Sequence, residues 1–209
     1  MKKILFFLLA LCLMAPAVEA QNKTLQKELK KEYKKKMKEY KKGKWALFAS
    51  TRTLEVALLT HYDKLNSMGE EGFEQVGIAS RFKSKSVGSQ MALNDACVQY
   101  ASTAGSTVKG RIISDLAGDG IEVDKEFDHF YAAYERLVEK EIKGEMQKSY
   151  SIIREIEDGV YEMQTFFIIN ESAASKARIR AFENAAKESE AAQRHAEKIS
   201  EFIKKGFDK

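Results

Sequence analysis

Outside the N-terminal segment, the side chains best suited to metal binding or nucleophilic catalysis are three histidines and one cysteine: His61, His129, His195 and Cys97. A zinc site requires several His or Cys ligands close together, and a catalytic cysteine requires a base beside it. The histidines fall on three different predicted helices, and apart from nearby glutamates none has a second ligand at helical spacing. We therefore interpret them as surface or boundary residues of helices, and we predict no metal site.

Cys97 lies in the middle of a predicted helix among Ala92, Ala96 and Ala101. A reactive cysteine needs surroundings that lower the pKa of its thiol, and no Cys-His signature is visible. We interpret Cys97 as a buried, small apolar side chain without a disulfide partner in the same chain. An intermolecular disulfide is the alternative.

Residues 115–126 (DLAGDGIEVDKE) partly match a calcium-binding loop between two helices. The first, fifth, sixth and last positions of such a loop are occupied as expected, by Asp115, Asp119, Gly120 and Glu126. However, Ala117 stands where an oxygen ligand is required, and Glu122 where an apolar residue normally packs. A helix–helix turn with Asp124 as N-cap explains the same residues, so we predict no calcium site.

The chain contains no G-x-S-x-G, P-loop, dinucleotide-binding or H-E-x-x-H motif. Two glycines, Gly105 and Gly110, lie inside a long predicted helix and form no phosphate-binding loop. No acid–base pair stands out either. We therefore predict a protein that is not an enzyme and has no cofactor.

A lysine-rich segment is the strongest anomaly, with eleven lysines and three glutamates between Lys23 and Lys44, a net charge of +8 (11 − 3). Apolar residues recur in it every three or four positions, which predicts an amphipathic helix ending at Gly43: Leu25, Leu29, Tyr33, Met37 and Tyr40. One interpretation is a solvated lysine face on a helix whose apolar stripe packs on the acidic remainder of the chain. The other is binding to an anionic envelope surface such as a membrane or lipopolysaccharide, through Lys30, Lys31, Lys34, Lys35, Lys38, Lys41 and Lys42.

Residues 1–20 have the pattern of a secretory signal peptide. A positively charged start precedes an apolar run from Ile4 to Met14, which is too short to span a membrane, and a small-residue cleavage site ends at Ala20. Cys12 suggests a lipoprotein, but Leu11 occupies the position where a small residue is needed. We predict cleavage after Ala20 and export to the bacterial periplasm or beyond, which excludes nucleic acid as a partner.

The chain beyond the signal has one cysteine and no proline, so its stability must come from an apolar core and its helices can be long. An Asp158-Gly159 pair between two β-branched and aromatic runs predicts a hairpin over residues 147–170. A type I′ turn would pair Ile156 with Tyr161 and Arg154 with Met163. The alternation predicts a first strand buried on one face only, with Tyr150, Ile152 and Ile156 on that face and Ser149, Ser151 and Glu155 on the other.

Two further strands and four helices surround this hairpin. Strands are predicted over 44–51 and 73–82, and helices over 54–65, 86–116, 126–144 and 171–206, the last with Asn170 or Ser172 as N-cap. The apolar side of the first of these helices includes a histidine: Leu54, Ala57, Leu58, His61 and Leu65. The predicted buried side of the second is Met91, Asn94, Val98, Ala101, Val108 and Ile112, and the third has an aromatic stripe: Phe127, Phe130, Tyr131, Tyr134, Leu137, Val138 and Ile142.

This order of elements predicts an α+β fold, with about four strands in an antiparallel or mixed sheet and long helices packed mainly on one face. The chain divides into a signal peptide (1–20), the lysine-rich amphipathic helix (21–44), an α+β core domain (45–170) and a long C-terminal helix (171–209). Part of that last helix should project or pair with the N-terminal helix.

The order of elements and a few short segments resemble known envelope proteins. The glycine-containing strand, the alanine-rich helix (ALNDACVQYASTAG) and the closing hairpin resemble the LPP20-like bacterial envelope lipoproteins. The segments KELKKE (27–32), Trp45 and LEVALLTHYD (54–63) are more similar to uncharacterised secreted proteins of Bacteroidetes. The resemblance implies an envelope protein of α+β architecture and brings no catalytic residue with it.

Two functions remain in view. The first is a non-enzymatic interaction or structural protein of the cell envelope, which binds an envelope protein, a second copy of itself through its long helices, or an anionic surface. The second is a periplasmic carrier of a small apolar or lipid ligand, bound between the sheet and the aromatic side chains of Phe130, Tyr131 and Tyr134. A cavity of several hundred Å³ would favour the carrier.

Overall fold

A computed structural model describes residues 24–116 and 123–195. The chain forms two compact units, Met1–Trp45 and Ala46–Lys209. The predicted signal peptide, with Cys12 and the cleavage site after Ala20, lies outside the described residues. So do residues 117–122, the middle of the segment that partly matches a calcium loop.

The first unit contains the lysine-rich helix, which extends over residues 24–42. It ends as predicted at Gly43, whose N–H donates to the carbonyl oxygen of Glu39 at 2.8 Å. The N–H of Trp45 donates to the carbonyl oxygen of Tyr40 at 2.9 Å. Lys44 then adopts a left-handed φ of 56°, which stops the helix. The predicted helix and its end are confirmed.

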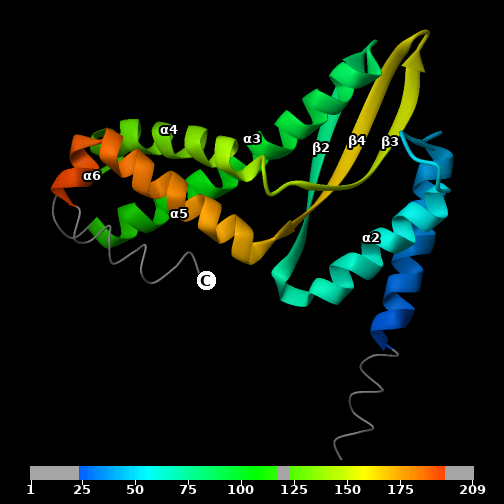
Figure 1. The fold of residues 1–209 in the computed structure, drawn as a ribbon, viewed down its shortest axis with the longest axis horizontal. Helices are drawn as coiled ribbons and strands as arrows, with labels where there is room; N and C mark the ends of the chain where they lie inside the picture. The colour runs from blue at the N-terminus through cyan, green and yellow to red at the C-terminus, as the bar shows by residue number, and fades with distance from the viewer. Residues whose placement is uncertain (1–23, 117–122, 196–209) are drawn as a thin grey trace, which may run out of the picture. The chain divides into compact units, whose positions relative to one another are not determined.

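The second unit contains one four-stranded antiparallel sheet, in the order β1-β3-β4-β2 (Figure 1). The strands are β1 (Ala46–Leu47), β2 (Gly72–Phe82), β3 (Gln147–Glu157) and β4 (Val160–Asn170). The α+β fold is therefore confirmed, with a purely antiparallel sheet. The first strand is much shorter than the predicted 44–51, because Ala49 has a left-handed φ of 53° that ends the extended backbone.

The β3–β4 hairpin turns at Asp158 and Gly159 as predicted, but the predicted register is wrong. Tyr161 pairs with Glu155 rather than with Ile156, because β3 contains an irregularity between Glu155 and Glu157. Only Gly159 has a positive φ, of 66°, so the predicted type I′ turn, which needs positive φ at both central residues, is also wrong.

The predicted one-sided burial of β3 is wrong as well. Tyr150 and Ile152 are buried, but so are Ser151 and Ile153 between and beside them. The hydroxyl of Ser151 forms a hydrogen bond with that of Thr165 on β4 at 2.9 Å, which satisfies both polar groups inside the core. The middle of β3 is therefore covered on both faces.

Helices cover one face of the sheet more extensively than the other. The long helix α3 (Lys85–Leu116) packs on β2 and also contacts α4 (Val123–Ile142), which packs against α5 (Glu171–Glu188) (Figure 1). The opposite face carries α2 (Leu54–Met68), followed by the short helix η1 (Gly69–Glu71). Thr53 caps α2, because its hydroxyl accepts the N–H of Val56 at 3.3 Å.

Small residues determine which side of α3 faces the sheet. Ala92, Ala96 and Cys97 are buried, whereas Met91 and Val98, predicted on the buried side, are 41% and 50% exposed. The predicted burial of these two residues is wrong. The predicted burial of Asn94 is also wrong, because Asn94 is exposed. Large side chains cannot lie in this interface because the helix approaches the sheet too closely. Farther along α3, the predicted Ala101, Val108 and Ile112 are buried.

The aromatic stripe of α4 is confirmed, and it fills the main core. Phe130 and Tyr134 have no exposed surface, and both rings pack edge-on against Phe182 of α5, with centroid distances of 5.1 and 5.8 Å. The aromatic residues of α4 therefore pack directly against α5.

The predicted uninterrupted C-terminal helix is wrong. Asn170 caps α5 as expected, through a hydrogen bond from the N–H of Ala173 at 3.1 Å, but α5 ends at Glu188. Ser189 has extended backbone angles and caps the next short helix, α6 (Glu190–Arg194), by accepting the N–H of Ala192 at 3.2 Å. Residues 196–209 lie outside the described part of the chain.

Candidate functional site

A polar cavity of about 390 Å³ lies in the second unit, between the loop after β1, helix α2 and the start of β3. Its lining includes two cationic residues, five hydroxyl residues and two aromatic rings, one of them that of a tyrosine counted among the hydroxyl residues: Arg52, Lys148, Ser50, Thr60, Ser149, Ser151, Tyr150 and Phe48. These residues come from two stretches of the chain, 48–60 and 148–151, that are far apart in sequence, so only the folded chain brings the two stretches together.

The backbone around this cavity departs from regular geometry at two places. Ala49, in the lining, has a left-handed φ of 53°, which is costly for a residue with a Cβ. Ser149 is the extra residue where the β3–β4 register shifts between Lys148 and Tyr150. Strained residues and bulges concentrate at ligand sites, because both direct side chains where a regular strand would not.

The two cations of the cavity are not neutralised by the protein. Within residues 24–116 and 123–195, neither Arg52 nor Lys148 forms an ion pair. The Lys148 ammonium lies 5.9 Å from the centre of the Phe48 ring. Burial lowers the pKa of Lys148, because the partly desolvated ammonium has no carboxylate beside it.

Behind the cavity, a buried histidine holds Ser149. His61 of α2 has no exposed surface, and its Nδ1 lies 2.9 Å from Ser149 Oγ. Its Nε2 lies 2.5 Å from Glu74 Oε2 on β2. Between these strands, the ring contacts Phe166 of β4 at a centroid distance of 6.2 Å. His61 therefore spans three strands of the sheet.

The carboxylate determines which nitrogen of the neutral ring carries the proton. Glu74 can only accept a hydrogen bond, so Nε2–H donates to it and Nδ1 accepts the hydroxyl proton of Ser149. The hydroxyl of Ser149 thereby has a fixed orientation, with its oxygen lone pairs left for another donor.

The order Glu74–His61–Ser149 has the same groups as an acid–base–nucleophile triad, but its geometry suits positioning better than catalysis. A catalytic histidine must pass the proton it takes on to the leaving group. His61 is fully buried, and its two nitrogens face Ser149 and Glu74, so the ring has no surface for a substrate.

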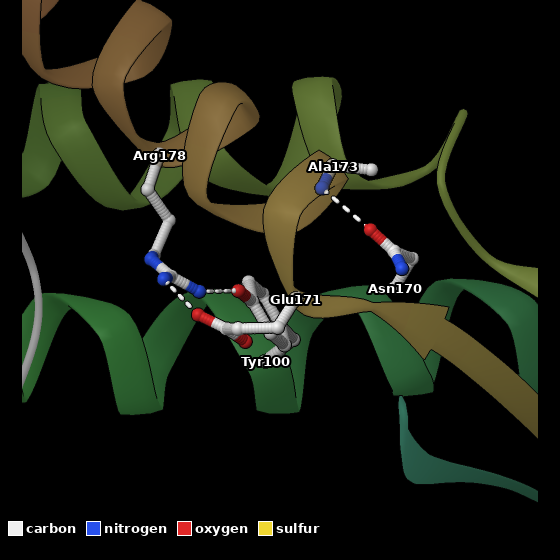
Figure 2. Close-up of polar contacts among 5 residues, drawn as sticks. All are labelled: Tyr100, Asn170, Glu171, Ala173 and Arg178. Carbon is white, nitrogen blue, oxygen red and sulfur yellow. Dashed lines mark hydrogen bonds and ion pairs between the residues drawn. The ribbon is translucent and has the colours of Figure 1, made fainter. Parts of the chain in front are cut away.

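A second polar cluster joins α5 to α3 (Figure 2). Arg178 donates hydrogen bonds to the hydroxyl of Tyr100 and to the carboxylate of Glu171, and its side chain is 11% exposed. Tyr100 stacks on Phe73 of β2 at a centroid distance of 6.0 Å. The charge of Arg178 is paired within the protein, so we interpret this cluster as a structural link between helices.

The predicted site residues lie in different surroundings. All seven lysines of the N-terminal helix that we assigned to anionic-surface binding are exposed. Cys97 is buried and unpaired, as predicted. His129 is exposed on α4, and His195 lies beside Phe127 at a centroid distance of 5.8 Å, which fits their interpretation as surface or boundary residues. His61 does not fit it, because it is fully buried.

Sequence reasoning did not identify the cavity. The one available signal was the histidine among the apolar residues of the helix over 54–65, since a buried imidazole requires hydrogen-bond partners. Arg52, Lys148 and Ser149 belong to a loop and a strand end, and nothing in the sequence shows that these segments meet.

Comparison with known protein families, with curated proteins and with solved structures finds no match to this chain. Within the described ranges, no three His, Cys, Asp or Glu residues come together as metal ligands. No helix in the same ranges is long and apolar enough to cross a membrane.

Proposed function

We propose that this protein is an exported, non-enzymatic binding or structural protein of the bacterial cell envelope, and that it associates with anionic lipid surfaces through its lysine-rich helix. The observation that carries the proposal is the exposure of all seven lysines around the stripe of Leu29, Tyr33, Met37 and Tyr40.

Charge and geometry together support this association. The segment from Lys23 to Lys44 has a net charge of +8, far above what solubility requires of one helix. Among the seven lysines, Lys31 forms an ion pair with Glu28 at 2.6 Å, and both side chains are largely exposed. An exposed ion pair of this kind contributes little free energy to stability. Each lysine near an anionic membrane contributes roughly 1 kcal/mol, so several acting together give measurable binding.

Vesicle sedimentation tests the proposal. The chain beginning at Gln21 should bind vesicles that contain phosphatidylglycerol, or lipopolysaccharide, and should not bind neutral phosphatidylcholine vesicles. Replacing the seven lysines with glutamine should abolish the binding, whereas replacing them with arginine, which keeps the charge, should preserve it. Circular dichroism of both variants checks that the helix is retained. Equal binding by both variants would refute the role of charge.

Export is tested by the mass of the protein recovered from a bacterial envelope. Cleavage after Ala20 gives a chain that begins at Gln21 without modification. A lipid-bearing N-terminus at Cys12 would instead make the protein a tethered lipoprotein.

The non-enzymatic part of the proposal rests on the burial of His61. Hydrolysis of activated esters or thioesters by the purified protein should not exceed the background rate. A hydrolysis rate above background that falls on Ser149→Ala would show that the Glu74–His61–Ser149 arrangement is catalytic, and would overturn this part of the proposal.

A further inference from the structure

We propose that the cavity between the loop after β1, helix α2 and the start of β3 binds the phosphate monoester of a small hydroxylated molecule. Arg52 and Lys148 would bind the phosphate, and Ser149 would accept a hydrogen bond from a hydroxyl group of the ligand. The site lies in the second unit and shares no residue with the lysine-rich helix, so it stands or fails independently of the proposed function.

The charge of the cavity favours a phosphate monoester over a carboxylate. Two cationic side chains line it, and neither has an ion-pair partner within the described residues. A phosphate monoester carries a charge of about −1.5 to −2 at neutral pH, which matches two cations better than a single carboxylate does. Glu74 is not among the residues that line the cavity, and its carboxylate lies at the opposite nitrogen of the His61 ring from Ser149.

The surroundings of Lys148 are compatible with the same conclusion. Lys148 is an exposed residue, but partial desolvation lowers the pKa of its ammonium, and an anion bound in the cavity would offset that effect. Arginine and lysine are both common phosphate ligands, arginine through its planar fork and lysine as a point charge.

Ser149 explains why the ligand should also carry a hydroxyl group. In the neutral His61 ring, the proton of Ser149 is directed to Nδ1, and the serine oxygen remains as an acceptor at the cavity. The oxygens of a phosphate dianion are acceptors only, whereas a ligand hydroxyl can donate to the serine oxygen. A volume of about 390 Å³ exceeds what a phosphate ion needs and lies within the range of small-molecule sites.

Calorimetric titration of the full mature chain tests the inference, with glycerol 3-phosphate as the probe and with inorganic phosphate and glycerol as comparisons. Glycerol 3-phosphate should bind more tightly than inorganic phosphate, and glycerol should not bind. The double variant Arg52→Gln, Lys148→Gln should weaken the binding of glycerol 3-phosphate about tenfold or more, because two charge-assisted contacts are lost. Lys140→Gln, at an exposed lysine on α4, is the matched control and should leave it unchanged.

Ser149→Ala separates the two parts of the site. This variant should bind glycerol 3-phosphate no better than inorganic phosphate, while its affinity for inorganic phosphate should be unchanged. Ser149 is an exposed residue, but the substitution removes the hydrogen-bond partner of the buried His61 Nδ1, so circular dichroism of the variant checks that the fold is retained. An unchanged preference for glycerol 3-phosphate would overturn the role of Ser149.

A lipid headgroup and a soluble ester share this chemistry, and vesicles distinguish them. The seven-lysine-to-glutamine variant removes the helix contribution. If that variant still binds phosphatidic acid vesicles, and does so only with Arg52 and Lys148 intact, the ligand is a headgroup; if it binds glycerol 3-phosphate alone, the ligand is soluble. Absence of glycerol 3-phosphate binding, or binding that survives the double substitution, would overturn the inference.

Discussion

The backbone of Ala92 on α3 lies directly over Gly77 on β2, so close that a Cβ atom on Gly77 would be 1.8 Å from the carbonyl oxygen of Ala92. The next nearest atoms are the carbonyl carbon of Ala92 and the Cβ of Ala96. Backbone atoms cannot move aside as a flexible side chain can. The distance between α3 and the sheet therefore depends on the missing side chain of Gly77.

Gly77→Ala should lower the free energy of unfolding by about 3 kcal/mol or more, because α3 must move away from β2 and lose buried contacts along its length. Urea unfolding followed by circular dichroism measures the change. Gly110→Ala is the control, since Gly110 lies in α3 and has no atom within 4 Å of the added Cβ. That substitution should stabilise the protein by up to about 1 kcal/mol, as expected for alanine in a helix. Similar effects of the two substitutions would contradict the close packing.

The same contact shows where sequence periodicity succeeds and where it fails. On α4, large aromatic residues form the stripe, and burial follows size, so Phe127, Phe130 and Tyr134 were predicted correctly. On the first half of α3 the relation between side-chain size and burial is reversed, because only alanine fits against Gly77 while Met91 and Val98 face outward. The periodicity of apolar residues cannot reveal this, since the approach distance is a property of two elements together.

The hairpin gives a second case. The Asp158-Gly159 pair predicted the turn, but the extra residue at Ile156 shifts the pairing and leaves that side chain 38% exposed. Bulges depend on the strands on either side and on the twist of the sheet, so no local sequence pattern predicts them. The extended conformation of Ser189 is similar, because serine is compatible with a helix interior and the break shows only in the folded chain.

The cavity could not be predicted for a related reason. Its parts are a loop of residues 48–52, one face of α2 and the bulged start of β3, and they meet only because β1 pairs with β3. His61 was visible as a polar residue in an apolar stripe, but its partners Glu74 and Ser149 are 13 and 88 residues away.

His61→Ala should lower the free energy of unfolding by about 3 kcal/mol, because it removes two hydrogen bonds and leaves a cavity under α2. His129→Ala, at an exposed position on α4, is the matched control and should change it by less than about 0.5 kcal/mol. Chemical denaturation of the two variants in parallel measures the difference. A cost below about 1 kcal/mol for His61→Ala would show that α2 is not anchored through this residue.

Cys97 should be nearly inert in the native protein. Burial raises the pKa of its thiol to about 11, although the charge of Lys143 acts in the opposite direction, so little thiolate is present at pH 8. In the chain beginning at Gln21, a bulky thiol reagent should label the native protein on the order of a hundredfold more slowly than the urea-unfolded protein. Cys97→Ala should cost only about 1 kcal/mol. Equal labelling rates in the two states would contradict the burial.

Alkaline pH should destabilise the protein through its buried tyrosines. Burial raises the pKa of Tyr134, and it also raises that of Tyr100 against the opposing charge of Arg178. Below about pH 10 these groups are protonated in both states and stability is unaffected; above it the unfolded chain releases protons that the native state retains, so stability falls. In a Cys97→Ala background, which removes the thiol titration, Tyr134→Phe should make this decline shallower. Parallel curves for the two proteins between pH 9 and pH 11 would refute the contribution of Tyr134.

Binding to anionic vesicles should depend steeply on salt if the lysines of the N-terminal helix act through charge. The Debye length shrinks from about 30 Å at about 0.01 M salt to about 3 Å at about 1 M, so each lysine then interacts only with a phosphate group in direct contact. Sedimentation with phosphatidylglycerol vesicles should show strong binding at the lower concentration and almost none at the higher. The seven-glutamine variant should show weak binding throughout, and the seven-arginine variant should follow the unmodified protein. Binding that persists in high salt would indicate that the apolar stripe of Leu25, Leu29 and Tyr33 inserts into the membrane, because the hydrophobic contribution is not screened by salt.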